Sequence, residues 1–145
     1  MMAQALEQAY LALAEGETPV GCVIVKEGRI IARGRNRRET EKDPTAHAEM
    51  EAIRAAARAT GDWRLTGCEL YVTLEPCPMC AGAMVMSQLG RCVWGAADPR
   101  QGCCGSVYDL PGDAALHGIT RWQGGVLEAE CARLMTDFFA SRRQP

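Results

Sequence analysis

The sequence lacks several features that would assign it to other classes of protein. No apolar run approaches the roughly 20 residues needed to cross a bilayer, which argues against a membrane role. We expect no secretory leader, and the sequence shows no internal repeat, low-complexity tract or linker. We therefore expect one domain spanning residues 1–145, and a domain of this size buries about 68–70% of its unfolded surface.

An excess of positive charge is also missing. The chain has 16 Lys and Arg against 18 Asp and Glu, a net charge of −2, which argues against a protein that wraps nucleic acid over its whole surface. The arginines are unevenly spread, however. Five of them lie between residues 29 and 38, and Arg142 and Arg143 lie near the end of the chain. A local basic patch therefore remains possible.

Cysteine, by contrast, is abundant, with eight residues in the chain. In a secreted protein this number would suggest disulfides, but the missing leader and the long apolar strands favour a reducing compartment, and we expect the cytoplasm. Cys103 and Cys104 are adjacent in a loop, where packing and redox roles are both open. Four cysteines on apolar faces of predicted elements are expected to be buried thiols: Cys22, Cys68, Cys92 and Cys131.

The two remaining cysteines carry the main functional signal. Cys77 and Cys80, in Pro-Cys-Pro-Met-Cys, are three residues apart, so on a helix both sulfurs can reach one metal ion at about 2.3 Å. A lone C-x-x-C also fits a redox pair or half of a zinc ribbon. No second C-x-x-C is present, whereas His47 and Glu49 form an H-x-E about thirty residues earlier. His47 is therefore the predicted third ligand.

Three protein ligands leave one tetrahedral position open, which distinguishes a catalytic zinc site from a structural one. Zinc lowers the pKa of bound water from about 15.7 to about 7, so hydroxide is available at neutral pH. Glu49 is the candidate proton carrier. Residues two apart on a helix do not face each other, so His47 and Glu49 can both reach the site only at a helix end.

The order of predicted elements is typical of a three-layer α/β/α domain around one five-stranded mixed sheet. Helices are expected over residues 3–15, from about Asp43 or Thr45 to 60, from Pro76 or Pro78 onward, and from 127 to about 138 or 139. Strands are expected over 20–25, 29–33, 68–74, 91–97 and 119–123. We read residues 34–44 as a loop and residues 107–110 as a short helical turn.

The pair H-x-E and P-C-x-x-C resembles the signature of zinc-dependent nucleobase deaminases. The chain as a whole resembles the cytidine and deoxycytidylate deaminase superfamily and, within it, the bacterial tRNA-specific adenosine deaminases. The resemblance covers most of the chain, at residues 16–25, 36, 43–49, 70–83, 95–96, 98, 105–106 and 125–139.

This resemblance implies a cytidine-deaminase-like fold and hydrolytic deamination of the wobble adenosine to inosine in a tRNA anticodon stem-loop. It implies a homodimer with one Zn²⁺ per chain, held by His47, Cys77 and Cys80, and Glu49 as the proton shuttle. It also implies contacts to the substrate from Asn36 and from the end of the last helix, where Phe138, Phe139, Arg142 and Arg143 combine aromatic stacking surfaces with charge.

Two other functions are compatible with the same motifs. One is deamination of a free nucleobase or nucleoside, such as guanine or cytosine, because the zinc motif does not choose between substrates. The other is a non-catalytic, zinc-structured subunit that presents RNA to a partner. Such a subunit is expected to have lost the proton carrier, and Glu49 is present.

Overall fold

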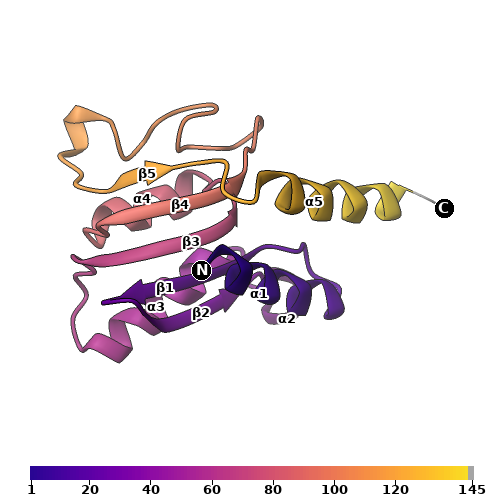
Figure 1. Cartoon of the computed structure of the whole chain (residues 1–145), viewed down its shortest axis with the longest axis horizontal. Helices are drawn as coiled ribbons and strands as arrows, with labels where there is room; N and C mark the ends of the chain where they lie inside the picture. The colour runs from indigo at the N-terminus through magenta and orange to yellow at the C-terminus, as the bar shows by residue number, and fades with distance from the viewer. Residues whose placement is uncertain (144–145) are drawn as a thin grey trace.

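The computed structural model describes residues 1–143, except for the side chain of Arg143. One sheet forms the centre of the domain, and helices pack against it (Figure 1). The elements follow in the order α1 (Met2–Ala14), β1 (Gly21–Lys26), β2 (Arg29–Arg35), α2 (Arg38–Glu41), α3 (Ala48–Thr60), β3 (Cys68–Leu74), α4 (Pro78–Met86), β4 (Arg91–Ala96), the 3₁₀ turn η1 (Ala114–Leu116), β5 (Arg121–Gln123) and α5 (Glu128–Arg143).

The five strands form one mixed sheet in the order β2-β1-β3-β4-β5. β1 pairs antiparallel with both β2 and β3, whereas β3, β4 and β5 are parallel. α4 is the crossover between β3 and β4, which are parallel and so cannot be joined by a tight turn. This arrangement confirms the predicted five-stranded mixed sheet.

Helices cover both faces of the sheet, so the domain has three layers. Successive side chains of a strand point to opposite faces, and on β1 Cys22 and Ile24 pack with α3 and α4 while Val23 and Val25 pack with α1 and α5. α5 extends past the ends of the strands (Figure 1). The four cysteines predicted to be buried thiols are buried, and Cys103 and Cys104 are buried as well.

A glycine brings α3 close to the sheet. A Cβ at Gly34 in β2 would overlap the backbone of Ala48 and Ala52 in α3, so only glycine allows this approach. The small side chains of these two alanines are fully buried at the same contact. The close approach fixes the start of α3, which carries His47 and Glu49.

The segment before α3 differs from its prediction as a loop. It contains the short helix α2, where the backbone N–H groups of Glu39 and Thr40 donate hydrogen bonds to the carboxylate of Glu17, which is distant in sequence. The predicted helix start near Asp43 or Thr45 places His47 in the first turn of α3, but His47 is the N-cap residue, with extended φ and ψ of −78° and 156°. A side chain from another segment thus decides the local structure here.

The long connection between β4 and β5 also departs from expectation. Residues 107–110 are not helical, because Asp109 pairs with Cys104 in an antiparallel bridge and Leu110 N–H donates to the Cys103 carbonyl. The only short helix of the described connection is η1, where the Asp113 side chain accepts a hydrogen bond from Ala115 N–H. No helix in the described part of the chain is both long and apolar enough to span a bilayer.

Candidate active site

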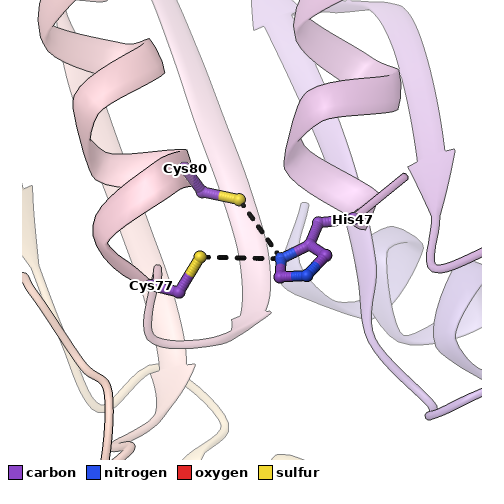
Figure 2. A group of neighbouring side chains, drawn as sticks. All are labelled: His47, Cys77 and Cys80. Carbon is purple, nitrogen blue, oxygen red and sulfur yellow. Dashed lines mark hydrogen bonds between the residues drawn. The ribbon is translucent and has the colours of Figure 1, made fainter. Parts of the chain in front are cut away.

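Three side chains predicted to bind metal meet where α3 and α4 begin. His47 is the N-cap of α3, Cys77 is the N-cap of α4, and Cys80 lies in the first turn of α4. The His47 Nδ1 atom is 3.6 Å from Cys77 Sγ and 3.5 Å from Cys80 Sγ (Figure 2). The three ligand atoms all lie within 4.8 Å of one another.

These distances fit a tetrahedral zinc site. Ideal Zn–N and Zn–S bonds of about 2.05 and 2.3 Å, at the tetrahedral angle, separate the nitrogen from each sulfur by about 3.6 Å. The two N···S distances at His47 agree with this separation. Two sulfurs and one imidazole also make a donor set that zinc prefers, and they leave a fourth position for a non-protein ligand.

Hydrogen bonds within the cluster already favour a thiolate. The hydrogen bond with Cys80 contributes most to lowering the pKa of the Cys77 thiol to about 4, and the hydrogen bond with His47 also lowers it. Partial burial opposes this change. The bond with Cys77 raises the pKa of Cys80 and also raises the pKa of His47. Metal ions bind deprotonated thiols and neutral imidazole, so metal binding at this cluster would be coupled to proton release.

Glu49 lies beside this cluster and is buried, with 4% of its surface exposed. Burial raises the pKa of its carboxyl to about 7, and the negative charge at Cys77 adds to the shift, against a backbone hydrogen bond that lowers it. A carboxyl with a pKa near neutrality can both accept and donate protons at physiological pH. Because His47 is the N-cap, Glu49 is the second residue of α3, and both reach the site from the helix end.

The cluster lies at one side of a cleft of about 800 Å³. Of the residues predicted to form the site, six line this cleft: Asn36, His47, Glu49, Cys77, Phe139 and Arg142. Cys80 is fully buried behind them. Asn36 is also buried, and its Oδ1 atom accepts a hydrogen bond from Arg38 N–H at 3.0 Å.

The end of α5 forms the far rim of the cleft. As expected for adjacent helix residues, Phe138 is buried at 8% exposure and Phe139 is exposed at 46%. The Arg142 guanidinium lies 4.6 Å from the Phe138 ring centroid and donates to the Gly16 carbonyl at 2.7 Å. Phe138 thus supports the rim from behind, and the side chain of Arg143 is outside the described part of the structure.

Sequence reasoning did not single out other residues that line the cleft. Arg38 comes from α2, and Asp98, Arg100 and Gln101 come from the loop after β4. Arg38 belonged to the arginine-rich segment noted in the sequence, so a signal existed. No local pattern marked Arg100 or Gln101, because their place depends on how the loop folds back over the strand ends.

Residues 1–96 match the family described as the cytidine and deoxycytidylate deaminase zinc-binding region. The chain belongs to this family. Its zinc-binding character and the His47, Cys77 and Cys80 cluster together support one Zn²⁺ per chain.

Relatives agree with this assignment. The chain is 47% identical to the tRNA-specific adenosine deaminase of Bacillus subtilis strain 168 over 143 residues, covering 99% of this chain and 89% of the relative. A solved structure from a study of A-to-I editing by tRNA:A34 deaminases has a TM-score of 0.88 and 41% identity, covering 92% of this chain and 96% of the other. Guanine deaminase from Bacillus subtilis is 32% identical with a TM-score of 0.66, covering 99% and 92%.

Proposed function

We propose that this protein is a zinc-dependent hydrolase that converts the wobble adenosine of a tRNA anticodon loop to inosine. The observation that carries the proposal is the position of Glu49, buried beside a three-ligand cluster at the side of an open cleft. Similarity across nearly the whole chain to a tRNA-specific adenosine deaminase supports tRNA as the substrate.

In this reaction His47, Cys77 and Cys80 would hold a zinc ion. Bound zinc lowers the pKa of a water ligand to about 7. Glu49 would take one proton from the attacking water and pass it to N1 of the purine ring, and would then take the proton of the new C6 hydroxyl and pass it to the departing amine. Adenosine and water thereby yield inosine and ammonia, and Glu49 ends with the proton count that it had at the start.

The rim of the cleft suits an unpaired RNA loop. Extruding a base that is already unpaired costs little, so an anticodon loop is a suitable substrate. Exposed Phe139 offers a stacking surface, and Arg38, Arg100 and Arg142 bring positive charge to the same cleft. Asn36 is the candidate contact to the extruded nucleoside.

We also infer that residues 1–145 form one domain that works as a homodimer in the cytoplasm. The hydrophobic side chains on both faces pack against the same five-stranded sheet, which supports one domain. Met86, Val107 and Ile119 are exposed apolar side chains on α4 and the β4–β5 connection, which supports an interface with a second copy. The eight cysteines are free thiols, in keeping with a reducing compartment.

Deamination of a free base is the second candidate function, because guanine deaminase from Bacillus subtilis shares the fold at 32% identity. A free base would occupy only part of the cleft and would leave the α5 rim without a role. The third possibility, a non-catalytic subunit, is disfavoured by the buried Glu49.

A substrate comparison tests the proposal. The zinc-loaded protein would be incubated with an anticodon stem-loop carrying a wobble adenosine, with free adenosine, and with guanine or cytosine. We expect inosine in the stem-loop and little conversion of the small molecules. A stem-loop with guanosine at the wobble position is the control. Much faster conversion of guanine or cytosine than of the RNA would overturn the assignment.

A further inference from the structure

Glu75 is a buried carboxylate that the reaction above does not use. It directly follows β3, two residues before Cys77, and only 2% of its surface is exposed. None of the salt bridges among the described side chains includes it. A buried carboxylate without a cation needs hydrogen-bond donors, so its partners indicate what it holds.

All the donors to Glu75 come from one loop, residues 97–106 after β4. Oε1 accepts from Asp98 N–H at 3.0 Å and from the Ser106 hydroxyl at 2.5 Å. Oε2 accepts from Cys104 N–H at 3.1 Å and from Ser106 N–H at 3.0 Å. The loop thus wraps around a single side chain, with both of its ends bonded to the same carboxylate.

Two further contacts tie this loop to the segment that carries the zinc ligands. Cys103 N–H donates to the Pro76 carbonyl at 2.8 Å, next to Cys77. A Cβ at Gly102 would overlap the Glu75 carboxyl group, so the loop backbone passes directly against it. The turn between these ends bears Pro99, Arg100 and Gln101, which line the cleft beside His47 and Cys77.

We propose that Glu75 is a positioning residue, whose carboxylate holds the loop 97–106 so that its cleft-lining residues stand beside the zinc cluster when the substrate binds. The inference rests on the proposed function for its substrate, but the contacts themselves do not depend on it. Glutamate suits this place because both oxygens of an ionised carboxylate accept hydrogen bonds and neither donates one.

Glutamine is the sharpest replacement because it has nearly the same shape. In Glu75→Gln one oxygen becomes an NH₂ group. Oε1 faces Asp98 N–H, and Oε2 faces the N–H groups of Cys104 and Ser106, so either orientation of the amide sets donor against donor. We therefore expect the loop to loosen in this variant while the cluster keeps its zinc, because the side-chain hydrogen bonds of Glu75 all go to the loop although Glu75 also lines the cleft.

The matched control is Glu69→Gln. Glu69 lies on β3, the strand that Glu75 directly follows, is partly exposed and pairs with Arg91 at 3.3 Å on the surface. Ser106→Ala serves as a second, milder variant, because it removes one donor and keeps the three backbone bonds to Glu75. It remains informative even if Glu75→Gln does not fold.

The test combines hydrogen exchange with kinetics on the zinc-loaded protein. In Glu75→Gln we expect faster exchange confined to amides of residues 97–106, one zinc per chain, and a KM for the anticodon stem-loop raised about tenfold, with kcat changed less than KM. Ser106→Ala should show the same pattern more weakly, and Glu69→Gln should match the wild type.

Two results would overturn the inference. One is unchanged exchange in the loop together with an unchanged KM. The other is faster exchange throughout the protein with loss of zinc, which would mean a general role in stability. The exchange measurement needs no substrate, so a failure of the proposed function, seen as no inosine from the wild type, is separate from a failure of this inference.

Discussion

Two regions border the same cleft but are built in different ways. One is the zinc-ligand corner, where His47, Cys77 and Cys80 meet beside Glu49, and the other is the rim formed by the end of α5. At the corner, Cys80 and Glu49 are buried, and each functional side chain is fixed by a helix start that packs on the sheet. At the rim, Phe139 is nearly half exposed and α5 extends past the strands (Figure 1). The proposed chemistry therefore lies in the core and the proposed substrate contacts lie on the surface, so substitutions at the zinc ligands and Glu49 should impair catalysis and substitutions at the end of α5 should impair substrate binding.

The largest effect is expected from Cys77→Ala at the corner. It leaves two ligands, so zinc should be lost and turnover should disappear. Stability should fall as well, because structural zinc can contribute on the order of 10 kcal/mol to folding. Metal analysis and thermal melting check this. Cys68→Ala, a buried thiol at the other end of β3, is the control and should keep its zinc. One zinc per chain in Cys77→Ala would remove Cys77 from the ligand set.

Glu49→Gln should separate chemistry from metal binding. Because the amide cannot carry protons, we expect kcat to fall about 10²- to 10⁴-fold while zinc content and melting temperature stay near the wild type. Single-turnover inosine formation measures this loss. Glu51→Gln, on the same helix and paired with Arg54, is the matched control and should retain activity. Unchanged turnover in Glu49→Gln would remove the proposed proton shuttle.

Substitutions at the rim should weaken RNA binding and spare the chemistry. Phe139→Ala should raise the Kd for the stem-loop by the equivalent of about 1–3 kcal/mol, the usual loss for one stacked base. Arg142→Ala should reduce the salt dependence of binding by about 0.7 in the log–log slope. Binding titrations at several salt concentrations check both. Arg133→Ala, exposed on α5 outside the cleft, is the control, and equal effects from all three variants would contradict a specific rim.

The smallest effect is expected at Glu17, a buried carboxylate that helps to shape the α2 side of the cleft. Burial alone would raise its pKa, but hydrogen bonds from the Thr40 hydroxyl, Thr40 N–H and Glu39 N–H together lower it below the ordinary 4.5. A folded-state pKa below the unfolded one stabilises the protein above the unfolded value, and this stabilisation is lost as pH falls through the folded value.

Urea unfolding of wild type and Glu17→Gln across this pH range measures the contribution. The variant should be less stable at neutral pH, and the difference from the wild type should shrink as the solution is acidified below about pH 4. A constant difference at every pH would show that ionisation of Glu17 plays no part.

The corner could be predicted from the sequence because its signals are local. Cys77 and Cys80 share a helix turn, and Pro78 marks where that helix begins. The bounds of β3 were predicted to the residue from its apolar pattern. The third zinc ligand lies about thirty residues before Cys77, and the H-x-E motif identified it as His47.

The walls of the cleft could not be predicted in the same way. α2 depends on Glu17, more than twenty residues earlier, and the loop 97–106 depends on Glu75, at a similar distance from its donors. Bonds from a side chain to a distant backbone leave no periodic trace in the sequence. Arg100 and Gln101 therefore reach the cleft through contacts that only the folded chain reveals.

X-ray absorption at the zinc edge of the purified protein tests the central claim most directly. The account predicts one zinc per chain with two sulfur ligands near 2.3 Å and one protein nitrogen near 2.0–2.1 Å, and one fewer nitrogen ligand from the protein in His47→Ala. A zinc bound by four sulfurs, or a protein without zinc, would contradict it.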